Sequence, residues 1–379
     1  MAKQQDTDKR YGAFTLTWTG AVCCTRRWVS LSPNGMPVGS ITNDRRPCVA
    51  VALPAKDEAG YLPDCLSALD EAAARFGGRV SVMVVANNCR DATLDVLGRS
   101  RLRHAELHWT AVSLLPGHRH AGWARRLAFD AAAALLGEPH HILLSTDADT
   151  LVSPDWIVGT ARHLARGADA VAGRALTRRD DRAALGPAAM RRLNLLGRYY
   201  TALDWLRADQ APAAEDPWPR HFYEGGASIA LTLGTYRLIG GAPTPALAED
   251  RALFAAVRAA GGTVRHPIDV RVFTSSRLDG RAPGGMADAF ARWIAQSDDE
   301  PLHETYAFPA ALDPERATTS DQLSFATLPA AIARAGALIR ARRSPAPPQV
   351  EPIQLPPLLA DRFDHLAQQS PEALDRVVP

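Results

Sequence analysis

The sequence HILLSTDADT, residues 141–150, runs from a short apolar stretch into two carboxylates, Asp147 and Asp149, with one residue between them. Such a stretch predicts a buried strand. Open α/β sheets bind their ligands beyond the carboxyl ends of the strands, so both carboxylates are expected at a binding edge. Mg²⁺ is usually held by one or two carboxylates together with substrate phosphates. The stretch therefore predicts a divalent metal, Mg²⁺ or Mn²⁺, on a phosphorylated substrate, with a solvated turn as the alternative.

The composition is that of a globular protein with little net charge. The chain has 379 residues, of which 46% are hydrophobic, and its 43 basic and 41 acidic residues give a net charge of +2. This balance gives no reason to expect nucleic acid as a partner. No apolar run approaches the roughly 18 residues of a membrane span, and the polar N-terminus does not resemble a signal peptide, so we expect a cytoplasmic protein. The cysteines form no Cys-x-x-Cys pair and are predicted to be free thiols: Cys23, Cys24, Cys48, Cys65 and Cys89.

Residues 47–274 alternate short β-branched runs with helical segments, which is the pattern of an α/β sheet. Strands are predicted at 49–53, 80–85, 107–114, 142–145 and 168–176. Helices are predicted after Tyr61, near Asp91, at 121–136 and after Ser153, which is expected to cap its helix. Residues 177–219 are long helical sequence and are expected to lie over the sheet. The two aspartates thus follow the fourth strand.

Three parts are predicted along the chain: an N-terminal extension at 1–46, a catalytic domain at 47–300, and a helical and Pro-rich tail at 301–379. In the tail, Leu328, Ile332, Ala335 and Ile339 share one face of a basic helix. Docking on the parent domain is the simpler interpretation of that face, and peripheral contact with a membrane surface is the alternative. The stripe from Met286 to Ile294 is interpreted as core or as a lid.

Polar loops follow the first two strands. The first begins Pro54-Ala55-Lys56-Asp57-Glu58, and the second runs from Asn87 to Thr93 and includes Asp91. Either loop alone is ordinary turn chemistry. Because parallel strands end at one edge, both loops are expected beside Asp147 and Asp149, where they would form a nucleotide pocket.

Five motifs in this order resemble those of family-2 glycosyltransferases, which have the type-A glycosyltransferase fold. They are the two loops, the Ala121-Gly122-Trp-Ala-Arg125 helix start, the Asp-x-Asp, and a Gly225-Gly226 segment followed by Ala248-Glu249-Asp250. The resemblance covers residues 47–275. It implies an α/β fold whose central, mostly parallel sheet is flanked by helices, with a nucleotide-sugar-binding N-terminal half and an acceptor-binding C-terminal half.

The resemblance also implies metal-assisted transfer of a hexosyl group from a nucleotide sugar to an acceptor hydroxyl, with inversion. Asp149 would hold the metal, with Asp147 nearer the ribose. Asp250 would be the general base, and Glu249 would orient the acceptor or the base. The residues implied to bind the donor are Pro54, Ala55, Lys56, Glu58, Asn87, Asp91, Gly122, Arg125, Asp147, Gly225 and Gly226. Arg277 and Arg281 lie where relatives carry a segment over the diphosphate.

Two alternatives stay open at this point. Glu249 and Asp250 also suit the positive end of a helix dipole. Ala86 stands where the family usually has an Asp, so a contact to the nucleobase is missing, which favours a non-catalytic nucleotide-sugar-binding protein of the same fold. A nucleotidyltransferase would be expected to carry a Gly-rich loop after its first strand, and this chain has none there. His266 is expected to be a packed histidine rather than a ligand.

Overall fold

The computed structural model describes residues 14–16, 47–280, 284–303, 306–313 and 322–343. The chain divides into two compact units, Met1–Ile339 and Arg340–Pro379. The predicted Pro-rich linker and terminus, Cys23, Cys24 and Arg281 lie outside the described residues. The predicted three-part division stays a prediction.

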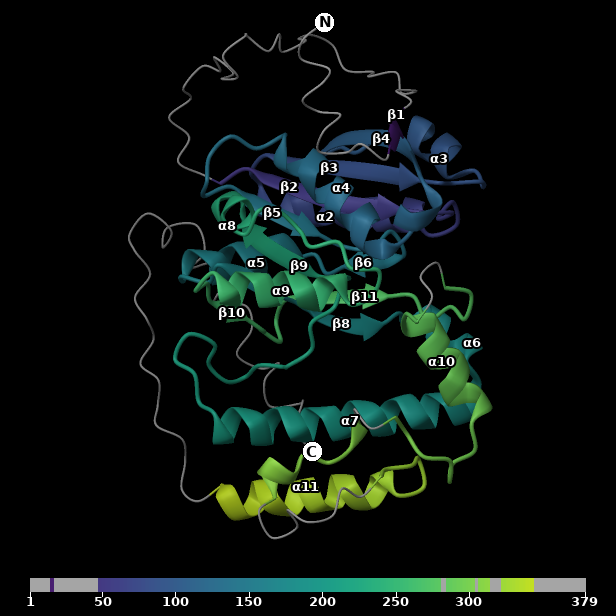
Figure 1. The fold of residues 1–379 in the computed structure, drawn as a ribbon, viewed down its shortest axis with the longest axis vertical. Helices are drawn as coiled ribbons and strands as arrows, with labels where there is room; N and C mark the ends of the chain where they lie inside the picture. Colours follow the sequence, from purple (N-terminus) through teal and green to yellow (C-terminus); the bar gives the residue numbers. More distant parts are fainter. Residues whose placement is uncertain (1–13, 17–46, 281–283, 304–305, 314–321, 344–379) are drawn as a thin grey trace, which may run out of the picture. The chain divides into compact units, whose positions relative to one another are not determined.

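An eight-stranded sheet with the order β1-β4-β3-β2-β5-β9-β7-β10 forms the centre of the fold (Figure 1). β4, β3, β2 and β5 are parallel, β9 is antiparallel to both β5 and β7, and β1 is antiparallel to β4. The strands are β1 (Phe14–Leu16), β2 (Val49–Ala55), β3 (Val80–Asn87), β4 (Glu106–Leu114), β5 (Ile142–Ser145), β7 (Ala170–Ala172), β9 (Ile229–Thr232) and β10 (Val264–Arg265). The predicted α/β architecture with a mostly parallel sheet is confirmed.

Helices cover both faces of this sheet because the side chains of a strand alternate between its faces. Val49, Val51 and Leu53 of β2 pack with α2 (Leu62–Phe76), α3 (Thr93–Arg99) and α5 (Trp156–Ala165). Ala50 and Ala52 pack with α4 (Ala121–Ala133), α8 (Leu233–Leu238) and α9 (Glu249–Ala259). The small alanines allow α4 to approach the sheet closely.

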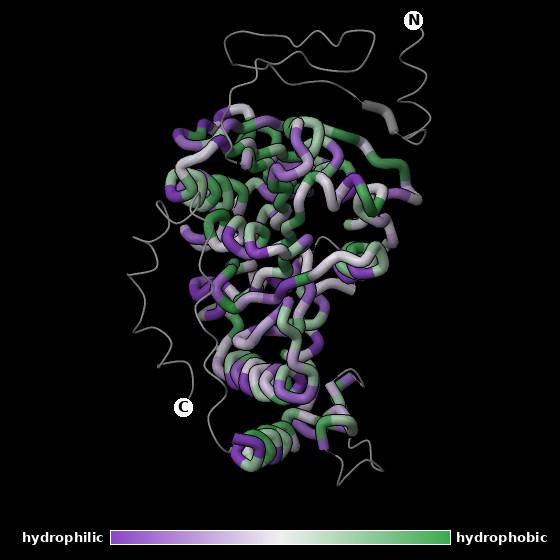
Figure 2. The backbone as a smooth tube through the Cα atoms, turned by 90° about the vertical axis from the view of Figure 1, so that its left-hand side faces the viewer, coloured by the Kyte–Doolittle hydropathy of each residue, from purple (hydrophilic) through white to green (hydrophobic). Residues whose placement is uncertain are grey.

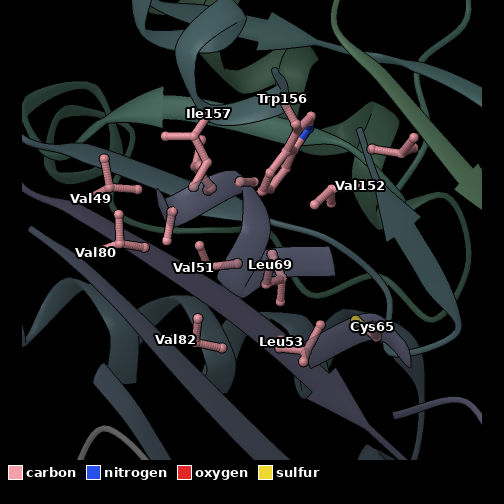
Figure 3. Close-up of a cluster of buried hydrophobic side chains, with 14 of the residues drawn as sticks. Val49, Val51, Leu53, Cys65, Leu69, Val80, Val82, Val152, Trp156 and Ile157 are labelled. Carbon is pink, nitrogen blue, oxygen red and sulfur yellow. The ribbon is translucent and has the colours of Figure 1, made fainter. Parts of the chain in front are cut away.

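The first of these cores lies between β2, β3, α2 and α5. Figure 3 shows Trp156 of α5 above the valines of β2 and β3, with Leu69 of α2 beside them. Trp156 is fully buried, and its indole nitrogen donates a hydrogen bond to the Ser228 hydroxyl at 2.8 Å. The predicted Ser153 cap is wrong, because α5 begins at Trp156 without a side-chain cap and only the Ser153 carbonyl accepts from its first amide.

A second, three-stranded sheet has the order β6-β11-β8 and consists of β6 (Thr150–Val152), β11 (Arg271–Thr274) and β8 (Arg174–Thr177). The single strand predicted at 168–176 is therefore wrong: it is two strands, β7 and β8, in different sheets. They separate at Gly173, where a Cβ would collide with the Ser228 side chain. The chain passes Ser228 there and leaves the central sheet.

A third core forms among helices. α7 (Gly186–Gln210) packs against α10 (Met286–Ala295), the short η3 turn (Ala310–Leu312) and α11 (Leu328–Arg342). The short α6 (Arg179–Ala184) precedes α7, and Figure 2 shows hydrophobic and hydrophilic residues alternating around α7 near the lower end of the view. The expectation that 177–219 covers the sheet is wrong for α7, because its buried side chains, such as Leu196 and Tyr199, belong to this helical core.

The two apolar stripes predicted in the C-terminal part contribute to this third core. Phe290 and Trp293 are buried, whereas Met286 and Ile294 of the same stripe are exposed. Leu328 and Ala335 of α11 are buried against the other helices, as docking on the parent domain requires. No helix within the described ranges is long and apolar enough to cross a membrane. Membrane-surface contact and the cytoplasmic location stay predictions.

Replacing Trp156 with Ala is expected to lower the free energy of unfolding by about 3–5 kcal/mol, because it leaves a cavity and removes the partner of Ser228. Chemical denaturation followed by circular dichroism measures this loss. Trp218→Ala is the matched control, since Trp218 is 49% exposed. Equal losses in the two variants would contradict the packing described for Trp156.

Candidate functional site

The loops after β2 and β3 are tied together at the carboxyl edge of the sheet, as expected. The Asp57 carboxylate accepts from the Arg90 amide at 2.6 Å, and the Asp91 carboxylate accepts from the Ala59 amide at 2.9 Å. The Asn87 side chain donates to the Ala55 carbonyl at 3.0 Å. Three polar side chains, two in the loops and Asn87 at the end of β3, therefore hold the two loops together.

Asp91 is held by its own loop as well. It accepts from the amide and the hydroxyl of Thr93. Burial alone would raise the pKa of Asp91, but the hydrogen bonds from Thr93 and Ala59 bring it below its usual value. Thr93 in turn accepts from the Glu58 amide at 2.8 Å, which fixes the backbone at Glu58.

A hollow of about 450 Å³ opens beside these loops. Of the predicted donor-binding residues it contains Lys56. Arg119, in a basic turn whose sequence suits either phosphate or solvent, also lines it, whereas Ser113 from the β4 end was not predicted. Its full lining is Lys56, Asp57, Asn88, Cys89, Arg90, Ser113 and Arg119. The register of β3 against β4 brings Ser113 here, and that register depends on a pairing the sequence pattern does not specify.

The guanidinium of Arg125 joins three of the five motifs. It donates to Asp147 at 2.9 Å, to Glu249 at 3.2 Å, and to the Gly226 carbonyl at 3.1 Å. It also donates to the Ser145 hydroxyl of β5 at 3.1 Å. Burial alone would lower the pKa of Arg125, but Asp147 and Glu249 hold it above its usual value. The buried charge is therefore paired with two carboxylates.

The motif glycines give room to neighbouring groups. A Cβ on Gly226 would overlap the Arg125 guanidinium, and a Cβ on Gly122 would overlap the Pro245 carbonyl. A Cβ on Gly225 would lie 2.5 Å from the Tyr223 ring. The three glycines thus let the start of α4, the 225–226 segment and the loop before α9 approach one another closely.

A second arginine, Arg277, closes the other side of the site. It makes two hydrogen bonds to Glu58, at 2.7 and 2.5 Å, and a contact to Asp149 at 3.0 Å. Its guanidinium also lies 5.1 Å from the centre of the Tyr61 ring. The antiparallel pairing of β11 with β6, with Thr274 opposite Thr150, brings Arg277 to Asp149. Arg277 therefore lies in the predicted site. There it contacts the carboxylates of Glu58 and Asp149.

Asp149 lies in a strongly negative environment. Burial, and then the charge of Asp147, raise its pKa to about 7, although Arg277 opposes the shift. One carboxylate oxygen accepts from the hydroxyls of Thr150 and Thr274, both at 3.5 Å. Within the described ranges no group of three or more His, Cys, Asp or Glu side chains is arranged to hold a metal. A pair of carboxylates still suits a hard cation that takes its other ligands from phosphates.

Asp250 lies in the first turn of α9, one residue after Glu249. Its carboxylate accepts from the Arg251 amide at 2.7 Å. Enclosure by the surrounding protein, and then the negative charges of Asp250 and Asp147, raise the pKa of Tyr223, although 47% of the residue's surface is exposed. His266 is buried between Asp216 at 2.8 Å and Glu224 at 3.1 Å, in agreement with the expected packed histidine.

No protein-family model and no curated protein sequence matches the chain. Solved structures are similar to it. TarS 1–349 of S. aureus with UDP-GlcNAc is 13% identical over 78% of this chain and 73% of that one, with a TM-score of 0.42. A mannosyltransferase of Pyrobaculum calidifontis with GDP-Man and Mn²⁺ is 20% identical over 86% and 82%, with a TM-score of 0.43.

A third similar structure is glucosyl-3-phosphoglycerate synthase of Mycobacterium tuberculosis with Mn²⁺, UDP and phosphoglyceric acid. It is 14% identical over 74% of this chain and 88% of that one, with a TM-score of 0.40. The α/β fold class of this chain rests on its own sheet topology. These likenesses carry nothing about its donor, acceptor or metal.

Gly226→Ala is expected to lower the free energy of unfolding by about 1–3 kcal/mol, because the added methyl group overlaps the Arg125 guanidinium and strains its ion pairs. Urea denaturation measures the change. Gly98→Ala in α3 is the control, since nothing lies within 4 Å of its Cβ position. If Gly226→Ala were as stable as this control, the close contact with Arg125 would be ruled out.

Proposed function

We propose that this chain is a metal-assisted glycosyltransferase that moves a hexosyl group from a nucleoside-diphosphate donor to an acceptor hydroxyl, with inversion. The observation that carries the proposal is the Arg125 centre, which joins Asp147, Gly226 and Glu249 by hydrogen bonds at 2.9 to 3.2 Å. Asp149 is the second neighbour of Asp147 in the chain, and Asp250 follows Glu249. The five-motif resemblance supports the same conclusion.

Asp149 is proposed to hold Mg²⁺ or Mn²⁺, with Asp147 beside it. When bound, the metal would act as a Lewis acid that stabilises the leaving diphosphate. The site has four carboxylates in contact with two guanidiniums. Arg125 contacts Asp147 and Glu249, and Arg277 contacts Asp149 and Glu58. This excess of negative charge fits a cation in the site.

Arg277 is proposed to turn toward the donor diphosphate when it enters. Arginine suits bidentate contact with phosphate oxygens. The two hydrogen bonds to Glu58 keep the guanidinium at the sheet edge, and its contact to Asp149 is the one that an entering cation would replace. Glu58 is thereby proposed to position Arg277.

The nucleoside is proposed to lie along the two braced loops. Asn87 and Asp91 would hold these loops in place, while Lys56 in the neighbouring hollow offers a hydrogen-bond donor to the nucleotide. Pro54 and Ala55 line the end of β2, and Gly122, Gly225 and Gly226 allow the close approach of the surrounding segments. Ala86 is buried and offers no carboxylate to a base.

On the acceptor side, Asp250 is proposed to take the proton from the attacking hydroxyl. A base on the face opposite the leaving diphosphate gives in-line attack and hence inversion. Glu249 binds Arg125, so it is proposed to position the first turn of α9, and through it Asp250, rather than to touch the acceptor.

The alternative, a binding protein without catalysis, is favoured by Ala86 and is decided by a transfer assay. A thermal-shift screen of nucleotide sugars with and without Mn²⁺ identifies the donor, because a ligand that binds only the folded state raises its stability. Hydrolysis or transfer of the identified donor then separates the enzyme from the binding protein, which would bind the donor and release no diphosphate.

Asp149→Ala is expected to remove the gain in nucleoside-diphosphate affinity that Mn²⁺ gives, because it removes the proposed metal ligand. Calorimetric titration of UDP and GDP, each with and without Mn²⁺, measures the gain. Asp155→Ala, six positions along the chain and outside the site, is the control. A variant at position 149 that keeps the full Mn²⁺-dependent gain would exclude Asp149 as the ligand.

Asp250→Asn is expected to lower the transfer rate by about 10²- to 10⁴-fold while donor affinity is retained, because the change keeps the shape and removes the base. The transfer rate, the donor affinity and the melting temperature are measured together. Asp95→Asn is the matched control, since Asp95 is an exposed acid in the first turn of α3. If Asp250 only complemented the helix dipole, both variants would lose about 0.3–1 kcal/mol of stability and the transfer rate would stay unchanged.

A further inference from the structure

A second hollow, of about 320 Å³, lies between the small sheet and the helices that follow it. Figure 1 shows β8 between β11 and α7, with α6 at the end of α7. Two arginines of α6 line the hollow together with apolar side chains from β8, β11 and α7. The lining residues are Ala175, Leu176, Thr177, Arg179, Arg182, Leu193, Gly197 and Phe273.

The apolar wall of this hollow is not filled by the protein itself. Leu176 and Phe273 are only partly buried and belong to none of the three cores described above. Apart from the adjacent backbone of its own helix, nothing lies within 4 Å of the Cβ position of Gly197, in the middle of α7. Two large apolar side chains thus face open space, which favours a ligand with an apolar body.

The charged rim of the hollow is positive. The Arg182 guanidinium donates to the Asn194 side chain at 3.3 Å, but its Nε is buried without a hydrogen-bond partner. The acids of α6 are engaged elsewhere: Asp180 pairs with Arg178, and Asp181 accepts from the Ser276 amide at 3.1 Å. A buried donor on a charged group without an acceptor is costly.

We propose that this hollow binds a small amphiphile with an apolar body and one anionic head, a carboxylate or a phosphate. The body would lie on Leu176 and Phe273, and the head would accept from Arg182, with Arg179 at the opening. The volume of about 320 Å³ is near the lower end of the range for small-molecule sites, so the ligand is short. The site lies on residues that the proposed sugar transfer does not use, and the two proposals stand or fall separately.

The probe is decanoate, titrated into the full-length protein by calorimetry below its micellar concentration. Saturable binding of one molecule per chain is expected. Gly197→Leu should weaken it at least 10-fold, because the new side chain occupies the hollow without strain in the helix. Gly98→Leu in α3 is the matched control, since its Cβ position is equally open. No binding to the parent, or equal binding by Gly197→Leu and the parent, would overturn the site.

The head group is tested separately. Arg182→Met should weaken decanoate binding about 10-fold and leave decanol binding unchanged, because it removes the charge and keeps an apolar stem. Decyl phosphate compared with decanoate identifies the preferred head. Binding of inorganic phosphate with no binding of decanoate would overturn the apolar body, and equal binding of decanol and decanoate would overturn the anionic head. An unchanged circular dichroism spectrum and melting temperature show that each variant is folded.

Discussion

The guanidinium of Arg125 is bound at once by a carboxylate from the end of β5, a carboxylate from α9 and a carbonyl from the 225–226 segment. A buried cation is unfavourable unless it is paired and hydrogen-bonded, so these segments must meet wherever Arg125 lies. The requirement extends to the backbone, because Gly226 can approach only without a Cβ. One side chain on α4 thus fixes the relative positions of the donor-side strands and the acceptor-side helix.

The small sheet positions the other arginine of the site, Arg277, beside Asp149. β6 starts directly after Asp149, and β11 ends three residues before Arg277, so their antiparallel pairing fixes a carboxylate and a guanidinium opposite each other. The residue before Arg277 contacts α6 as well, because the Ser276 amide donates a hydrogen bond to the Asp181 carboxylate. The backbone beside Arg277 is thus tied to α6, which also lines the second hollow.

The sequence patterns predicted the features that depend on neighbouring residues. The apolar run at 142–145, the loops after β2 and β3, and the helix start at Ala121 are local signals, and the structure has them. The partners of Arg125 and Arg277 were not predictable in this way, because Glu249 is 124 residues from Arg125 and Glu58 is 219 residues from Arg277. The predicted strand at 168–176 is wrong for a similar reason. The chain leaves the central sheet at Gly173, where it passes close to Ser228, and Ser228 is distant in the sequence.

The difference between local and distant signals also explains why the helical sequence of α7 was predicted correctly but its position was not. The periodicity of α7 indicates a buried face, but it does not say which element buries it. Its partner Trp293 in α10 is 101 residues from Arg192, and α11 lies farther downstream. Once α7 packs on those helices, its remaining side faces β8 across a gap that Gly197 leaves open. The hollow follows from that division, because α7 gives most of its large apolar residues to the helical core and contributes Leu193 and Gly197 to the hollow.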